Sequence, residues 1–226
     1  MGTIDRTELK RHAKKVLKGN LGLVIGSLVI MLLINTVLGG IPVLGWLALL
    51  VVPPITSYGV QKILLKISRE EHTQVNTLFD GFSIFLTIII SDILVGLITS
   101  VVVIITILAV FIITMVLPWY AKIALIIMSV SIMTTTVLLG LSLTKYIIID
   151  LDGDIKATQA IKTSWEIMDG YKWELLKLQF SFIGWILLGA FTFGIAYIWV
   201  APYIGVTTAG FYDHVINEKS PVKRQR

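Results

Sequence analysis

Cysteine is absent from the sequence, and charged residues are scarce. The first absence excludes disulfides, thiolate nucleophiles and cysteine-based metal sites. Charged residues make up 15% of the 226 residues, whereas soluble domains contain about 25%. Hydrophobic residues make up 56%. This balance predicts a protein of the membrane rather than a soluble domain.

Four long stretches of the sequence contain no charged residue. They hold 43 residues after Lys18, 29 after Asp92, 22 after Lys122 and 35 after Lys177. A helix needs roughly 20 apolar residues to cross a bilayer, so each of the two shorter stretches predicts one helix. The two longer stretches have turn signals near their middles, at Gly39-Gly40-Ile41-Pro42 and at Gly194, and each predicts a hairpin of two helices.

The charge-free stretches together predict an all-α fold. We expect a polytopic membrane protein of about six transmembrane helices in three hairpins, which form a single integral membrane domain over residues 1–226. The expected spans are Leu21–Leu38, Val43–Leu64, Ile93–Val116, Ala121–Ile149, Leu178–Phe193 and Tyr197–Ile216.

Two further segments have the spacing of amphipathic helices that lie on the membrane surface. The first is residues 1–19, and the second is residues 150–176, which Asp152 or Asp154 is placed to cap. A basic tail follows at residues 217–226. The basic face of the first segment supplies the candidate contacts for anionic lipid, which are Lys10, Arg11, Lys14, Lys15 and Lys18.

The distribution of Lys and Arg predicts the orientation. In the six-span arrangement, 18 of the 19 Lys and Arg residues lie on one face of the membrane, and only Lys122 lies on the other. Cytoplasmic loops carry an excess of basic residues, so we expect a cell-membrane protein with both termini in the cytoplasm. Anionic membrane lipid, rather than nucleic acid, then accounts for the net charge of +5.

Asp92 is the one acidic residue embedded in apolar sequence, within Ile88-Ile89-Ile90-Ser91-Asp92-Ile93-Leu94. A carboxylate inside a membrane is costly and suggests an ion or proton path, so Asp92 is a candidate intramembrane polar site. The alternative is that Asp92 lies at the cytoplasmic interface and caps the spanning helix. The sequence shows no second embedded charge to pair with it.

Small residues and prolines recur inside the apolar stretches. Gly40, Gly45 and Pro53 align with Gly189, Gly194 and Pro202 at a constant offset of 149, which suggests an internal repeat of hairpins. The alternative is that such residues recur in any membrane helix, where they permit close packing or a kink. The candidate packing or hinge positions are Gly40, Pro53, Gly184, Gly189, Gly194 and Pro202.

Reactive constellations are missing from the sequence. The three histidines are isolated, and no HExxH, GxSxG or GxxxxGK[ST] motif occurs. Asp150, Asp152 and Asp154 suggest a calcium loop, but Ile155 and Ile161 stand where an EF-hand needs Gly and Glu. We therefore assign no catalytic residue, metal site or cofactor, and expect a protein that is not an enzyme.

Several motifs resemble one family of uncharacterised membrane proteins. They are Ser164-Trp165-Glu166-Ile167-Met168-Asp169-Gly170-Tyr171-Lys172-Trp173, Ser181-Phe182-Ile183-Gly184-Trp185, Pro202-Tyr203, Phe211-Tyr212 and Leu17-Lys18-Gly19-Asn20. The chain is similar in these motifs to domain-of-unknown-function family 975 of Gram-positive bacteria. Its Leu117-Pro118-Trp119 turn and its Asp152-Gly153-Asp154 segment depart from the family pattern. The resemblance implies a multi-pass bacterial membrane protein and brings no catalytic residues.

Three classes of function remain open from the sequence. The favoured one is a non-enzymatic membrane module: an accessory subunit, an immunity or stress-protection protein, or an organiser of the lipid surface. It would contact membrane lipids and another membrane protein or a further copy of itself. The alternative is a small transporter or channel for a lipid-like or apolar substrate, because the spans offer little polar lining. An intramembrane enzyme ranks last.

Overall fold

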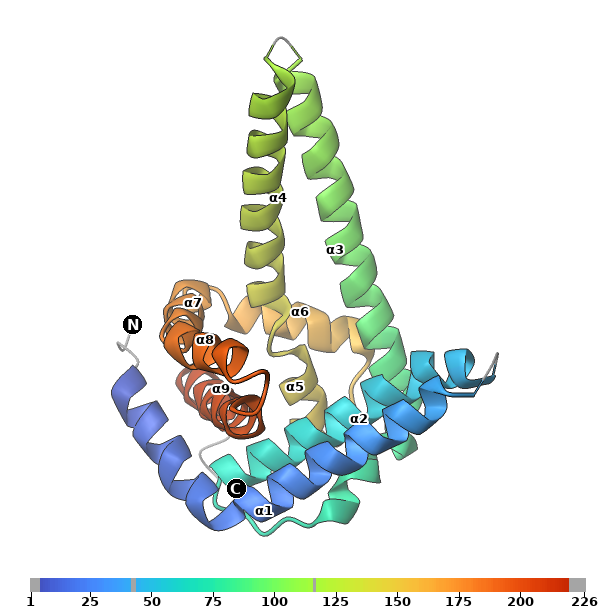
Figure 1. Ribbon diagram of the computed structural model, residues 1–226, viewed down its shortest axis with the longest axis vertical. Helices are drawn as coiled ribbons and strands as arrows, with labels where there is room; N and C mark the ends of the chain where they lie inside the picture. The colour runs from blue at the N-terminus through green and yellow to red at the C-terminus, as the bar shows by residue number, and fades with distance from the viewer. Residues whose placement is uncertain (1–4, 42–43, 116, 220–226) are drawn as a thin grey trace.

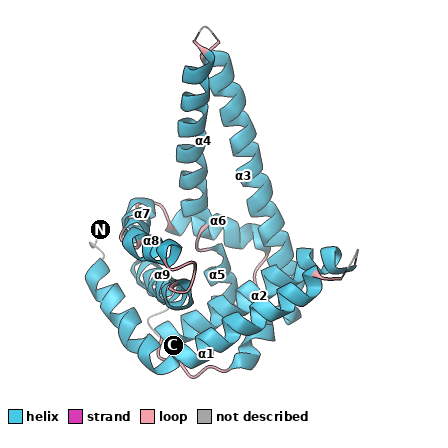
Figure 2. Cartoon of the chain, viewed as in Figure 1, coloured by secondary structure: helices cyan, strands magenta, loops and turns pink. Residues whose placement is uncertain are grey.

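The computed structural model describes residues 5–41, 44–115 and 117–219 of the chain. Within these ranges the protein is built from helices and short loops, without a strand (Figure 2). The elements are α1 (Arg6–Gly39), α2 (Leu44–Ser68), the 3-10 helix η1 (Val75–Ile84), α3 (Phe85–Ile113), α4 (Trp119–Leu141), α5 (Thr144–Asp150), α6 (Ala157–Ile167), α7 (Lys172–Phe180), α8 (Ile183–Phe191) and α9 (Tyr197–Lys219).

Three helical hairpins extend from a shared base. Figure 1 shows α1–α2, α3–α4 and α8–α9 leaving this base in different directions, with α5 and α6 at its centre. Five described helical segments are long and apolar enough to cross a membrane. The chain is therefore an all-α polytopic membrane protein, and the count of six spans holds only approximately. α9 is not among the five, because its final turns carry the polar residues Asp213, His214 and Glu218.

The N-terminal basic segment and the first span form one continuous helix. The sequence predicted a surface helix over 1–19 and a separate span from Leu21, whereas α1 runs without interruption from Arg6 to Gly39. Figure 1 shows that α1 changes direction in its first half. Asp5 caps it, because the carboxylate accepts hydrogen bonds from the backbone of Thr7 and Glu8. The cationic face therefore belongs to the same helix as the apolar first span, although the helix bends between them (Figure 1).

The α3–α4 hairpin projects farthest from the base (Figure 1). Its apolar side chains are largely uncovered: Ile104 is 56% exposed, Ile112 67% and Ile127 62%. Burial of apolar surface contributes about 25 cal/mol per Å², so a hairpin left this bare in water would lose most of that stabilisation. Its surface fits contact with lipid chains.

Two predicted spans are each interrupted by a short break that contains a serine. The span predicted over 121–149 breaks between α4 and α5, and the span predicted over 178–193 breaks between α7 and α8. At each break a serine hydroxyl donates to the carbonyl three residues earlier, Ser142 to Leu139 and Ser181 to Leu178. Such local bonds compete with the regular helix ladder. The hydropathy pattern does not predict these helix breaks.

The base holds the hydrophobic core, which joins α1, α2, α5, α6, α7 and α9. α6 buries Ala157, Ala160 and Ser164. Ser164 donates a hydrogen bond of 2.9 Å to the carbonyl of Gly140. Trp165 lies against the same glycine, where an added Cβ would meet its ring at 2.4 Å. The foot of α4 is therefore fixed to α6 by a close contact that needs glycine.

The ends of several predicted segments differ in the structure. α6 begins after Lys156 without a side-chain cap, so the expected capping by Asp152 or Asp154 was wrong. The polar segment predicted over 150–176 contributes to α5, α6 and α7 rather than to one helix. α9 extends to Lys219, into the predicted tail 217–226. The rest of that tail, residues 1–4 and the predicted boundaries at Pro42, Val43 and Val116 lie outside the described residues.

Candidate functional site

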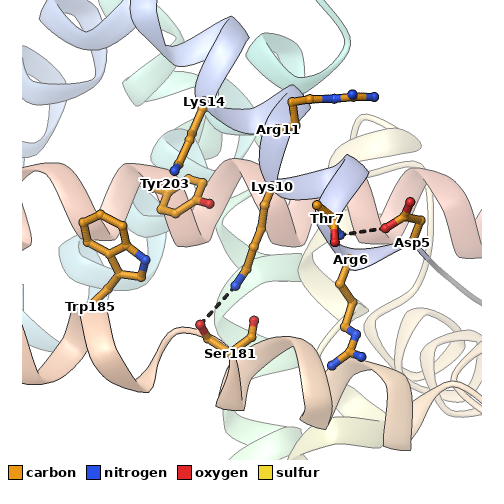
Figure 3. Close-up of a pocket in the computed structure, with 9 residues that line it drawn as sticks. All are labelled: Asp5, Arg6, Thr7, Lys10, Arg11, Lys14, Ser181, Trp185 and Tyr203. Carbon is orange, nitrogen blue, oxygen red and sulfur yellow. Dashed lines mark hydrogen bonds between the residues drawn. The ribbon is translucent and has the colours of Figure 1, made fainter.

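A basic pocket of about 640 Å³ opens between the start of α1 and the base of the α8–α9 hairpin. It is built from two parts of the chain that are remote in sequence, as Figure 3 shows. The lining residues are Asp5, Arg6, Thr7, Lys10, Arg11 and Lys14 from the N-terminal side, with Ser181, Trp185 and Tyr203 opposite.

Helical spacing places three of the cations on one face. Arg6, Lys10 and Lys14 are four residues apart, and such residues are neighbours along a helix. Lys10 Nζ donates to the backbone carbonyl of Ser181 at 3.0 Å and lies 4.3 Å from the ring centre of Phe182. In Figure 3 both lysines reach across the gap towards the opposite wall.

An aromatic wall faces Lys14. Its Nζ lies 5.6 Å from the ring centre of Trp185 and 5.5 Å from that of Tyr203. The two rings contact each other edge to face, with centres 6.1 Å apart. Cations within about 6 Å of an aromatic ring are attracted by its negative face. The wall therefore holds Lys14 in place without neutralising its charge.

The five predicted lipid contacts do not stay together. Lys10, Arg11 and Lys14 line the basic pocket, although Figure 3 shows Arg11 directed away from the aromatic wall. Lys15 lines a different depression, beside Glu70 and Glu71. Lys18 is exposed and lines neither. The sequence indicated a basic face, but only folding shows which of its residues meet α8 and α9.

The cations of the basic pocket lack acidic partners. Throughout residues 5–41, 44–115 and 117–219, no ion pair involves Arg6, Lys10, Arg11 or Lys14. Asp5 lines the pocket, but its carboxylate accepts from Thr7 N at 2.8 Å and Glu8 N at 3.3 Å. The backbone bonds from Glu8 and Thr7 lower the pKa of Asp5 and keep it ionised for that cap.

Asp92 lies inside α3, where it has a partner that the sequence did not reveal. Its Oδ2 lies 3.0 Å from Nζ of Lys145, on α5, and that amine also donates to Ser57 at 3.3 Å. The capping alternative is wrong, because α3 begins at Phe85 after the N-cap residue Ile84. The two charges close one side of a cleft of about 600 Å³ between α2, α3, α5 and α9.

Substitution of Asp92 and Lys145, singly and together, tests whether this ion pair stabilises the protein. Asp92 is 32% exposed and Lys145 25%, so we expect a coupling of about 1 kcal/mol, the upper end for accessible pairs. Asp92→Asn and Lys145→Gln should each lower the thermal stability in detergent, and the double variant should lose less than their sum. Additive losses, or no rescue by the exchange Asp92→Lys with Lys145→Asp, would contradict the coupling.

A second ion cluster ties α2 to α5 and α9. Arg69 donates to Asp150 at 2.9 Å and, through Nε, to Asp213 at 3.0 Å, and the Tyr212 hydroxyl donates to Asp150 at 2.9 Å. Burial alone would lower the pKa of Arg69, but its hydrogen bonds to Asp213 and Asp150 outweigh burial and raise it. Nearby, Lys62 bridges Asp80 and Asp152 at 3.1 and 3.0 Å. Asp150 and Asp152, two of the three aspartates that suggested calcium, are thus held by cations.

The candidate glycines occupy different environments. Gly40 follows α1 in right-handed helical backbone, and Gly194 adopts φ +92° in the turn between α8 and α9. A Cβ added at Gly189 would lie 2.6 Å from the Tyr197 ring, whereas a Cβ added at Gly184 would meet nothing within 4 Å. Gly184 therefore makes no close contact within the described chain, unlike the role suggested for it.

The candidate prolines do not interrupt their helices. Pro53 lies within α2 and Pro202 within α9, and both helices continue through them. Thr56 donates to the carbonyl of Val52, in the turn where proline removes backbone donors. The two prolines occupy comparable places in their hairpins. Gly40 and Gly189 do not, because one ends α1 and the other lies inside α8, which weakens the proposed repeat.

No group of three metal-ligating side chains occurs among residues 5–41, 44–115 and 117–219. The model of one protein family matches residues 1–219. The chain belongs to the family described as "Protein of unknown function (DUF975)". No curated protein and no solved structure matches it. Membership in this family assigns no activity, so function has to be argued from the pocket and the ion pairs.

Proposed function

We propose that this family member is a non-enzymatic module of the bacterial cell membrane that organises anionic lipid at the cytoplasmic surface. The observation that carries the proposal is the unpaired basic face of α1, with Lys10, Arg11, Lys14, Lys15 and Lys18 outside any described ion pair. A cation near an anionic leaflet gains about 1 kcal/mol. Cytoplasmic termini follow from the same basic surface.

In this proposal the apolar hairpins hold the protein in the membrane, and the basic face binds anionic lipid. The apolar α3–α4 hairpin and the apolar part of α1 are both candidate membrane spans, so the basic face at the start of α1 is not needed as an anchor. The positive charge of this basic face then determines which lipids gather around the protein. Because α1 is continuous with a spanning helix, the cations stay at a fixed depth and close to the base of the molecule.

Lipid enrichment around the purified protein tests this function. We would reconstitute the full chain in nanodiscs of phosphatidylcholine and phosphatidylglycerol, extract it gently and quantify the retained lipids by mass spectrometry. The unmodified protein should retain phosphatidylglycerol above its share of the mixture, and less so at high salt. Replacement of all five basic residues with glutamine should remove this preference.

A control variant with basic residues replaced outside α1 tests whether the position of the removed charge matters. Lys122, Lys156 and Lys162 lie outside α1, and their replacement with glutamine should leave the enrichment nearly unchanged. Equal enrichment in all three proteins would reject the proposed function. A protein retained at fixed stoichiometry, instead of lipid, would favour an accessory or immunity role.

The cleft beside Asp92 and Lys145 supports a second candidate, a transporter for an amphiphilic substrate. Apolar side chains such as Leu64 and Leu141 line it together with polar ones such as Gln61 and Thr208. A lipid-like molecule with a charged group would match both parts of this lining. Substrate flux in liposomes that Asp92→Asn abolishes would favour this candidate, and unchanged flux would exclude a mechanism that depends on Asp92.

A further inference from the structure

The basic pocket is an open concavity, in which Lys10 is half-buried and Arg6, Arg11 and Lys14 are exposed. A concavity fits a compact charged group better than a flat charged surface does. Its volume of about 640 Å³ falls in the range of small-ligand sites. We infer that the pocket is a stoichiometric site for a phosphomonoester, a phosphate group with two negative charges. This inference rests on the proposed function and deepens it, since it names the headgroup chemistry.

The charge of the pocket favours a dianion. Four cations and one carboxylate line it, which leaves an excess of three positive charges, and the carboxylate of Asp5 is already occupied by backbone N–H groups. Figure 3 places Lys10 and Lys14 on the inner side and Arg11 outward. A phosphomonoester carries about −1.5 to −2 charge at neutral pH, whereas a phosphodiester carries one.

Hydrogen-bond donors remain available in the pocket. An ammonium group has three donors, and Lys10 uses one of them on the carbonyl of Ser181. Lys14 faces aromatic rings, which leave its N–H donors without an oxygen acceptor on that side. Arg6 extends from the first turn of α1 along the rim (Figure 3). Charge-assisted bonds from these groups are the strong kind that phosphate recognition uses.

The surroundings favour a phosphate carried by a lipid. Trp185 and Tyr203 form the wall, and such aromatic residues concentrate at the level of lipid headgroups. α8, which begins beside the pocket, carries the exposed apolar side chains Ile183 and Ile186, 43% and 41% exposed. A phosphate in the pocket would therefore let the acyl chains lie along α8, an arrangement that a soluble phosphate ester would not use.

Quenching of tryptophan fluorescence tests the site directly. The full chain in detergent would be titrated with brominated phosphatidic acid, and Trp185→Phe would identify the part of the signal that comes from the pocket. Unlabelled phosphatidic acid should reverse the quenching, and phosphatidylglycerol should do so about tenfold less well. This comparison uses the unmodified protein, so it does not depend on any variant folding.

Two matched pairs of variants locate the binding. Lys10→Gln with Lys14→Gln should weaken the binding of phosphatidic acid about tenfold or more. Lys15→Gln with Lys18→Gln removes the same charge from the same helix and should change it less than about twofold. Melting curves would confirm that both pairs fold. An equal effect of the two pairs, or equal competition by both lipids, would overturn the inference.

The remaining outcomes distinguish a lipid ligand from a soluble one, and failure of the phosphate site from failure of the proposed function. Inorganic phosphate or glycerol 3-phosphate that competes as well as phosphatidic acid would keep the phosphate site and assign it to a soluble ester. If the pairs behave alike while the five-residue variant still loses phosphatidylglycerol, the phosphomonoester site fails but the proposed binding of anionic lipid by the basic face of α1 stands. If neither lipid is enriched around the unmodified protein, the proposed function fails as well.

Discussion

Replacement of Arg69 with methionine is expected to lower the free energy of unfolding by about 3 kcal/mol, the lower end for breaking a buried ion pair, because the Arg69 side chain is itself 29% exposed. Its carboxylate partners are well covered, with Asp150 8% exposed and Asp213 23%. Without the guanidinium, two carboxylates would remain close together with little solvent. The loss is measurable as a drop in melting temperature and in monodisperse protein after detergent extraction.

Two comparisons decide whether the ion cluster is the cause. Lys66→Met removes a cation from the same end of α2, but Lys66 belongs to no described ion pair, so its effect should be small. Arg69→Met combined with Asp213→Asn should recover part of the stability, because one of the stranded charges is gone. Equal losses for Arg69→Met and Lys66→Met would show that the cluster contributes nothing.

Gly59→Ala is expected to cost about 3 kcal/mol, the upper end for an overpacked interior. A Cβ at Gly59 would lie 2.1 Å from the carbonyl oxygen of Leu78, and Leu78 is fully buried in η1. Backbone cannot rotate away as a side chain can, so α2 and η1 would have to separate. Thermal melting of the purified protein in detergent would report the loss.

Gly22→Ala supplies the control for this substitution. Gly22 lies inside α1, and a Cβ there would meet nothing within 4 Å, so alanine should leave the stability unchanged or raise it slightly. If both substitutions leave the melting temperature unchanged, the close approach of α2 to η1 does not support the fold.

Runs without charge predicted where helices cross the membrane, because the cost of burying a charge in lipid acts on each segment separately. That argument located the three hairpins and their turns. It did not detect the breaks at Ser142 and Ser181, because the hydroxyl bond to the carbonyl three residues earlier also occurs at Ser91, where α3 continues unbroken. It also treated 1–19 as a separate helix, whereas nothing in Gly19-Asn20 stops α1.

The ion pairs could not be predicted, because they join residues that are far apart in sequence. Lys145 lay near the end of the span predicted over 121–149 and Asp92 lay in an apolar run, and only the packing of α5 beside α3 brings them within 3.0 Å. Arg69 and Asp213 are likewise separated by 144 positions. The basic face of α1 was visible from helical spacing alone, but its aromatic wall comes from α8 and α9 and required the fold.

The basic end of α1 and the arm that packs against α2 belong to one helix, which bends in its first half (Figure 1). Because no loop separates them from Arg6 to Gly39, a shift of the basic end against α8–α9 would act on the far arm through this bend. α2 packs along that arm and would follow it. Lipid composition around the basic end would in this way influence the tilt of a hairpin whose tip lies at the opposite end of the helix.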